Sequence, residues 1–513
     1  MKKFLYLILS TLPAFGQTAT PVMTARAAAR FLDQATWGPT PASIAAVQQM
    51  GINDWLAAQF AATPSDLPDE PILAVDGKSN NNLTPIVGVF YQNTITGPDQ
   101  LRQRVAFILS QIWVVSQVSV HPAYAFPPYW RTFRDNAFGS YSGIIKAVTL
   151  SPAMGTYLNM ANNNKANPVK GTAANENYAR ELMQLFTLGL TQLNPDGTPV
   201  LDANQNPVPT YDQSVVTNLA KVLTGWTYPT APNAKAKNNN PAYYFGQMFA
   251  VETEHDSTTK TIFNNIIVPA GQTAEQDLDT VLVDLMQQPS MGPFISKQLI
   301  QHMVTSNPSP AYVQRIAQVF SSTGGDMKAV ITAILTDTEA RAGDDPNAQA
   351  NPNFGHLREP MVFLTSLVRG LNGTVTTANG LNGYANETGE NLFNSASVFS
   401  YFSPLNRTEG GLYGPEFQIY STQTAADRAN AISAALYGSL DKTTQLDLSP
   451  FIDKAGNVSD LADYIGYAFL HNAMSSDLKQ AVTDAANAAG TAKAKAQAAL
   501  YIALTSSEYQ VIH

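Results

Sequence analysis

The 513-residue chain contains no cysteine, and charged residues make up only 13% of it. The first absence excludes disulfide bonds, thiolate zinc sites and a cysteine nucleophile. The formal net charge is −9, and no block of Lys and Arg is long enough to follow a phosphate backbone. We therefore expect no nucleic-acid partner.

Several common catalytic signatures are also missing. The chain has no Gly-Lys-Ser/Thr phosphate loop, no dinucleotide-binding glycine fingerprint and no His-Glu-x-x-His motif. The stretch "GSYSG" places Tyr141 where a nucleophile elbow would carry serine. The six histidines stand singly, so local spacing predicts no compact metal site. The sequence leaves any cofactor unknown.

One apolar run stands at the N-terminus, in "MKKFLYLILSTLPAFGQ". Two lysines precede it and small residues follow it, which is typical of a secretory signal peptide over residues 1–16. The run is shorter than the ~20 residues of a membrane span, and it contains no twin arginine. We expect export by the general secretory route to the periplasm or the cell exterior. No later run predicts a membrane span after cleavage.

The rest of the chain is 44% hydrophobic and mostly of helical period. From Asp99 the residues Leu101, Val105 and Ile108 predict a long buried helix, and a second is expected over 129–148. Three short helices are expected over 24–60, separated by breaks at Pro39 and Pro41 and at Gly51. Further helices are expected at 212–223 and four times between 275 and 336. The turn-rich segment 191–210 predicts a small β-hairpin. The predicted class is all-α: one large multi-helical domain over 17–513 with long irregular loops.

The first candidate site lies in "NENYARELMQLFTLGL", residues 175–190, which reads as one capped amphipathic helix. An ion pair between Glu176 and Arg180 would explain much of its charge. Arg180 and Glu181 are adjacent, however, so one of them must lie near the apolar boundary and needs a partner there. Asn177, Arg180 and Glu181 are therefore candidates either for structure or for a binding or catalytic site.

The second candidate is the loop "ETEHDSTTKT", residues 252–261. His255, Asp256 and Lys260 offer a general base, an acid and a cation within one segment. The competing explanation is that Asp256 caps a turn and His255 is a solvated loop residue.

Two further groups of residues are candidates for ligand contacts. Arg358 stands in "HLREP", where it either forms an inter-helix ion pair or reaches a ligand. Tyr401 and Tyr413 lie in aromatic segments broken by glycine and proline. Such aromatic rings either stack on sugar rings in a groove or pack within turns.

Eight segments, taken in order, resemble the domain of unknown function 1800 family: "RFLDQATWGPT", "NENYARELMQLFTLGL", "LTGW", "EHDSTTK", "TSNPSPAYV", "GGDMKAVITAILTDTEAR", "LREP" and "GPEFQIY". The resemblance covers about residues 25–511. It implies an exported bacterial protein, often encoded beside a partner family that resembles sulfatases and alkaline phosphatases. It supplies no established catalytic residue. Where many members have "ELMELHTLG", this chain has Gln184 and Phe186 in place of an acidic residue and a histidine.

Two functional hypotheses follow. The first is an exported soluble protein that binds or helps process an extracellular polymer such as a polysaccharide, with a sulfatase- or phosphatase-like partner. The second is an extracytoplasmic hydrolase in which Glu181, Arg180, His255 and Asp256 meet on folding. Asn177, Lys260, Arg358, Tyr401 and Tyr413 would contact the ligand in either case.

Overall fold

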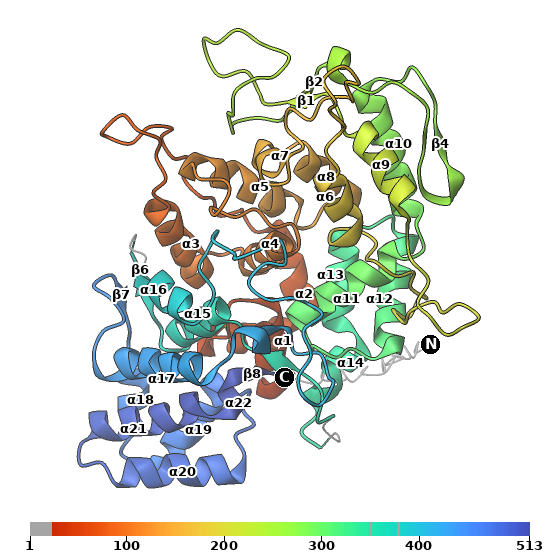
Figure 1. Cartoon of the computed structure of the whole chain (residues 1–513). Helices are drawn as coiled ribbons and strands as arrows, with labels where there is room; N and C mark the ends of the chain where they lie inside the picture. Colours follow the sequence, from red (N-terminus) through yellow and green to blue (C-terminus); the bar gives the residue numbers. More distant parts are fainter. Residues whose placement is uncertain (1–22, 348–350, 377–379) are drawn as a thin grey trace, which may run out of the picture.

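The computed structural model describes residues 23–347, 351–376 and 380–513. In these ranges the chain is built from helices, and its strands are pairs of two-residue segments (Figure 1). The all-α prediction is confirmed. The predicted signal peptide, 1–16, lies outside the described residues, so its cleavage and the single domain over 17–513 stay predictions. Within the described ranges no helix combines the length and the apolar character that a membrane crossing requires.

The N-terminal part of the chain forms short and medium helices. They are α1 (Ala25–Ala35), α2 (Pro41–Ala61), α3 (Thr84–Thr96), α4 (Gln100–Ile112), η1 (Ala123–Ala125), α5 (Phe126–Asn136), α6 (Tyr141–Thr149), α7 (Pro152–Tyr157), α8 (Asn177–Gln184) and α9 (Gln213–Val222).

The central part begins with small strand pairs and continues as a helical unit. Its elements are β1 (Trp226–Thr227), β2 (Phe249–Ala250), η2 (Glu252–Glu254), β3 (Lys260–Thr261), η3 (Phe263–Asn265), β4 (Ile267–Val268), α10 (Ala274–Gln287), α11 (Met291–Met303), α12 (Pro310–Ser322), α13 (Met327–Thr336), α14 (Thr338–Arg341) and η4 (Ala342–Asp344). Strand β1 pairs antiparallel with β2, and β3 with β4. The four helices expected between 275 and 336 are α10 to α13.

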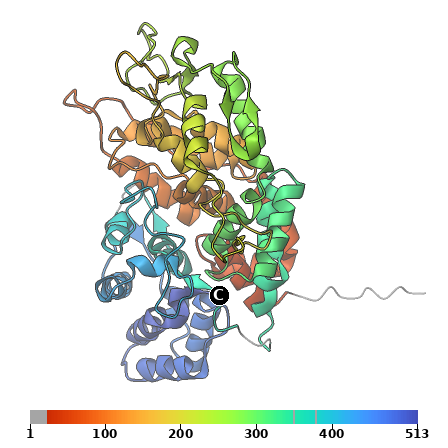
Figure 2. The same ribbon diagram turned by 45° about the vertical axis from the view of Figure 1, so that its right-hand side comes forward.

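The C-terminal part forms the other end of the molecule. It contains β5 (His356–Leu357), α15 (Pro360–Gly370), β6 (Thr374–Val375), α16 (Gly380–Glu387), η5 (Pro415–Ile419), α17 (Thr422–Tyr437), β7 (Thr444–Gln445), α18 (Ser449–Ile452), α19 (Val458–Phe469), α20 (Ser476–Asn487), α21 (Ala492–Thr505), α22 (Ser507–Gln510) and β8 (Val511–Ile512). Strand β5 pairs antiparallel with β8, and β6 with β7. Helices α17 to α22 gather at one end, opposite the loops around β1 and β2 (Figures 1 and 2).

Local sequence signals set most helix ends. Thr40 begins α2 with a reciprocal capping box to Ser43, and the Asp326 side chain accepts two backbone N–H groups at the start of α13. The single helix expected over 129–148 is wrong. The chain turns after Asn136, and Ser140 then caps α6 by accepting the N–H of Gly143 at 3.1 Å. Residues 25–60 form α1 and α2, and the break expected at Gly51 is a kink inside α2, where φ is 80°.

The hairpin expected at 191–210 is present as antiparallel bridges. Leu193 faces Pro199, and Leu201 faces Pro207. The prolines have no N–H to donate, which explains why single bridges form here and no longer ladder. The Asp202 carboxylate fastens the turn by accepting the N–H groups of Asn204 and Asn206, each at 2.8 Å.

Helix α1 is the hub of the core. Buried apolar side chains form one continuous cluster that reaches from Ala28 to Ile512, and nine of the eleven residues of α1 are buried. Among them is Asp33, whose carboxylate accepts two hydrogen bonds from Arg358, at 2.5 and 2.8 Å. The Nε2 atom of His471 lies 2.8 Å from the same carboxylate. Burial alone would raise the pKa of Asp33, but Arg358 and His471 hold it well below its usual value.

We predict that Asp33→Asn destabilises the fold by about 3–5 kcal/mol, because it leaves the buried Arg358 guanidinium without its counter-charge. The free energy of unfolding from urea titrations at neutral pH measures this. The matched control is Asp463→Asn, since Asp463 is 62% exposed and pairs with Lys479 on the surface. Its expected cost is below ~1 kcal/mol. Equal losses in the two variants would contradict the prediction.

Candidate functional site

Four segments that are distant in sequence meet around an asparagine-rich turn after α7. The N–H of Asn162 donates to the carbonyl of Trp226 at 2.7 Å, and that of Lys165 donates to the carbonyl of Glu254 at 2.8 Å. The Asn163 side chain exchanges hydrogen bonds with the backbone of Asn175, at 2.8 and 3.2 Å. Segments 161–165, 175–177, 225–227 and 252–255 therefore form one assembly. Three of them contain motifs on which the family resemblance depends.

The surface of this assembly contains a depression that is open to solvent and has a volume of about 470 Å³. Its walls are mostly polar, and six of its twelve lining residues are asparagines. The lining residues are Asn159, Ala161, Asn162, Asn163, Asn164, Lys165, Asn167, Lys170, Thr172, Ala173, Asn175 and Glu254. We call it the amide depression. The candidate Asn177 lies beside it, since its side chain donates to the side-chain oxygen of Asn159 at 3.2 Å.

A group of aromatic rings lies a few residues along the chain from one rim of the amide depression. The carbonyl of Asn240 accepts a hydrogen bond from the Asn162 side chain at 3.0 Å. Three residues further on, Tyr243 and Phe245 pack against Tyr124, with ring centroids 6.4 and 5.3 Å away. Tyr243 and Phe245 are only partly buried. We call these three rings the aromatic platform.

His255 is enclosed beneath the same assembly. Its side chain is 1% exposed, and its ring nitrogens contact the carbonyl of Thr224 at 2.9 Å and the Asp277 carboxylate at 3.1 Å. Gly225 makes this packing possible, because a Cβ atom there would lie 2.9 Å from the His255 backbone nitrogen. Lys260 is also buried and donates to Asp277. The expectation of a solvated His255 is wrong; the ring forms part of a buried charge cluster.

Asp256 closes the turn that follows. Its carboxylate accepts the N–H of Thr258 at 2.9 Å and also the Thr258 hydroxyl. Burial acts to raise the pKa of Asp256, but the hydrogen bonds from Thr258 and the nearby lysine charges lower it. These contacts are those of a turn cap, the structural alternative for this residue.

Arg180 and Glu181 point to different surroundings on α8. The Arg180 side chain is 41% exposed and pairs with Glu176 at 3.1 Å, as the sequence predicts. Glu181 is partly buried, and its Oε2 atom has no hydrogen-bond partner among the described residues. Burial raises the pKa of Glu181, and Arg180 offsets part of that rise. The Glu181 charge in turn adds to the burial that raises the pKa of Tyr157 to about 12.

The remaining candidates lie in other parts of the molecule. Arg358 is the buried partner of Asp33 described above. The Tyr413 ring lies between two cations, with the Lys297 nitrogen 4.1 Å and the Arg407 guanidinium 4.0 Å from its centroid. Tyr401 donates its hydroxyl to the carbonyl of Asn391 at 2.9 Å. The two tyrosines do not line the amide depression.

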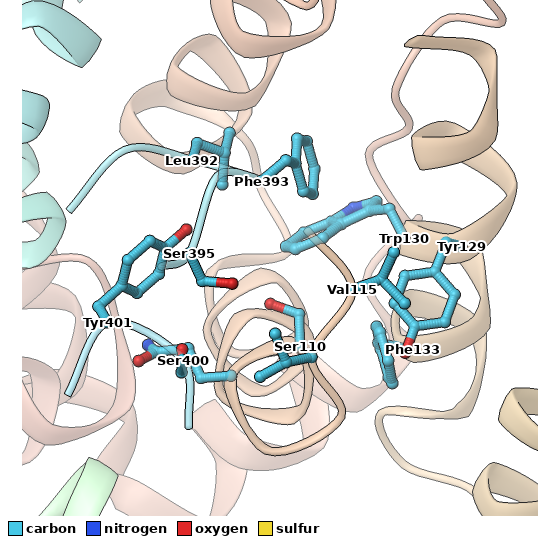
Figure 3. A pocket seen from close by; sticks show the side chains of 12 residues that line it. Ser110, Val115, Tyr129, Trp130, Phe133, Leu392, Phe393, Ser395, Ser400 and Tyr401 are labelled. Carbon is cyan, nitrogen blue, oxygen red and sulfur yellow. The ribbon is translucent and has the colours of Figure 1, made fainter. Parts of the chain in front are cut away.

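Tyr401 instead lines a small enclosed cavity between α4, α5 and the loop after α16. Figure 3 shows the hydroxyls of Ser110 and Ser395 directed into this space beside the indole of Trp130. Its volume of about 20 Å³ is room for about one water molecule. The cavity is therefore too small for a polymer, in contrast to the amide depression.

A pair of buried carboxyl groups lies next to this cavity. Glu359 is held by the Arg104 guanidinium and by the Gln111 side chain at 2.8 Å. Glu390 is fully buried, accepts the N–H of Met361 at 2.7 Å and hydrogen-bonds to Glu359. Burial first, and then the adjacent Glu359 charge, raise the pKa of Glu390 well above its usual value. Glu390 therefore keeps its proton, which it shares with Glu359 through their hydrogen bond, to a higher pH than an exposed glutamate does.

This shared proton predicts a stability that depends on pH. Because the pKa of Glu390 is raised in the folded state, its protonated carboxyl group adds to the free energy of unfolding. This contribution is fully present below about pH 4.5, the pKa of an exposed glutamate, and falls as the pH rises toward the pKa of the folded state. In Glu390→Gln the amide donates to Glu359 without titrating. We expect the stability of the wild type, relative to this variant, to fall as the pH is raised from about 5 to 9.

Urea unfolding of both proteins at a series of pH values measures the effect. Glu387→Gln is the control, because Glu387 stands three residues earlier, at the end of α16, but is exposed. Its stability should follow the wild type at every pH. Parallel curves for the wild type and Glu390→Gln would refute the shared proton.

Sequence reasoning missed three parts of this arrangement. Asp277 and Glu390 are single acidic residues in ordinary helical and loop sequence, and only their distant partners distinguish them. The run "ANNNKAN", 161–167, did carry a signal, because it interrupts a helical pattern with amides. Across the described ranges no group of three or more His, Asp and Glu side chains is placed to hold a metal ion.

The fold and this assembly define a large all-α protein with an amide-lined depression at one end. Residues 30–511 match the model of the family described as "Protein of unknown function (DUF1800)". The chain belongs to this family, as the eight sequence segments predict. No curated protein and no solved structure matches the chain.

Proposed function

We propose that this protein binds a polysaccharide outside the cytoplasm, in the amide depression. The observation that carries the proposal is the lining, in which asparagine side chains make up half of the residues. Each amide offers both donors and an acceptor, as each sugar hydroxyl does. A surface of amides therefore suits a hydroxyl-rich polymer better than an isolated charge or an apolar groove would.

The shape of the depression supports the same ligand class. Its volume of about 470 Å³ lies within the range of roughly 300–1,000 Å³ for ligand sites. It is open to solvent, so a long chain could enter and leave at its ends. Asn164 and Thr172 line it, and the side chains of both make no hydrogen bond within the described residues. Their polar groups are available to a ligand.

The aromatic platform adds an apolar surface next to the polar one. Sugar rings have C–H faces that bury favourably against aromatic rings. Only two residues separate Asn240 at the rim from Tyr243, a span of at most about 11 Å along the chain. A polymer held in the amide depression would reach Tyr243 and Phe245 with its next units.

The hydrolase alternative has less support. Both ring nitrogens of His255 contact protein groups, and the side chain is almost fully enclosed. Asp256 holds a turn, and Arg180 pairs with Glu176. A chemical step would have to depend on Glu181, whose raised pKa and unpartnered oxygen suit an acid. The catalytic roles of these residues and the partner protein expected from the family stay predictions.

The double variant Asn164→Ala/Thr172→Ala tests the proposal. Loss of the hydrogen bonds to two side chains should weaken polysaccharide binding about tenfold. Affinity electrophoresis with a panel of soluble polysaccharides, followed by calorimetry on the best binder, gives the measurement. Thermal unfolding should be unchanged, because neither side chain makes a hydrogen bond with the described part of the chain.

The matched control is Asn487→Ala at the end of α20. This side chain is exposed and makes no hydrogen bond with the described residues, but helix α20 lies at the opposite end of the molecule (Figure 1). It should bind as the wild type does. The proposal fails if no polysaccharide binds, or if the control loses as much affinity as the double variant.

A further inference from the structure

We infer that the amide depression selects an anionic polysaccharide, one whose sugar units carry carboxylate or sulfate groups. This inference rests on the proposed function and names the substrate class of the same site. It comes from the cations at the depression, whereas the proposal above depends on the amides.

Two lysines line the amide depression. Lys165 and Lys170 are both exposed, and neither side chain forms an ion pair, a hydrogen bond or a ring contact within the described residues. Lys237 adds a third cation close by. The backbone N–H of Lys237 donates to the Asn240 side chain at 2.9 Å. The carbonyl of Asn240 in turn accepts a hydrogen bond from the side chain of Asn162, a lining residue.

At three other places on the surface a lysine pairs with a carboxylate. Lys146 pairs with Asp279 at 2.6 Å, Lys78 with Asp76 at 3.1 Å and Lys479 with Asp463 at 2.5 Å. Lys165 and Lys170 form no such pair with the described residues, and both line the same depression of a chain whose net charge is −9. Two cations that no neighbouring carboxylate neutralises would attract a polyanion to this place.

The one carboxylate in the depression does not cancel them. Glu254 accepts a hydrogen bond from the Asn238 side chain at 2.8 Å, which fixes it at the wall. The lining residues thus carry two positive charges and one negative charge. Lysine is a flexible point charge, so it suits carboxylate and sulfate groups alike, at varied positions along a sugar chain.

The geometry favours a sugar chain over a nucleic acid. A phosphate backbone calls for a continuous basic track, and the lysines here are few and set among amides. The amides match ring hydroxyls and the lysines match the acidic groups, so each part of the lining has a counterpart in one polymer.

The experiment compares four polymers with the purified protein at about 50 and 200 mM salt. Polygalacturonate carries carboxylates, dextran sulfate carries sulfates, dextran is neutral, and polyglutamate is a polyanion without sugar. Polygalacturonate or dextran sulfate should bind about tenfold more tightly than dextran at low salt, and that advantage should shrink at high salt. Whichever of the two binds more tightly identifies the acidic group.

The variant Lys165→Gln/Lys170→Gln should lose most of this advantage, about tenfold, because its affinity for the acidic polymers falls far more than its affinity for dextran. The control Lys442→Gln/Lys495→Gln removes the same charge near α17 and α21 and should bind as the wild type does. Equal binding of dextran and the acidic polymers would overturn the inference but leave the proposed function intact. Polyglutamate binding as tightly as the acidic polysaccharides would also overturn it, and no binding of any polysaccharide would refute both.

Discussion

The fold depends on one buried negative charge. Asp33 lies in the middle of α1, and its carboxylate holds Arg358, more than three hundred residues further along the chain, and His471, over a hundred residues beyond that. Arg358 also donates to the carbonyl of Tyr509 at 3.1 Å. A buried charge is tolerated only when it is fully paired. The three segments must therefore meet in one arrangement, and the apolar side chains around α1 pack on the frame that this produces.

The two ends of the molecule follow different physical rules. Around α1 the charged groups are buried and paired with one another, as Glu359 is with Arg104. Around the amide depression polar groups are numerous, and several side chains, such as those of Asn164 and Lys165, have no partner among the described residues. The first pattern gives rigidity, and the second leaves hydrogen-bonding capacity for something outside the chain. The buried cluster of His255, Asp277 and Lys260 begins directly after Glu254, a lining residue, and fastens that side of the depression to α10.

The sequence predicted helices well where their apolar period is regular, as in 275–336, which forms α10 to α13. Local residues also mark where some helices begin, since Asp326 caps α13 and Pro360 is the first residue of α15. The prediction failed at 129–148, where Gly139 and Ser140 separate two helices of the same period. The local pair of Glu176 and Arg180 could be predicted, but the distant partners of charged residues could not. Nothing near Arg358 in sequence points to Asp33, and nothing near His255 points to Asp277, because those pairings arise only when distant helices pack.

The pairing of β5 with β8 has a consequence for the order in which the chain can fold. His356 and Leu357 join Ile512 and Val511, and the carbonyl of Gln510 accepts the N–H of Arg358 at 2.8 Å. The residue that anchors the hub is thus itself fastened by residues far later in the sequence. Contacts this far apart in sequence form slowly. A growing chain cannot complete the frame around Asp33 until residue 510 has been made, so the final packing around α1 belongs to the later steps of folding.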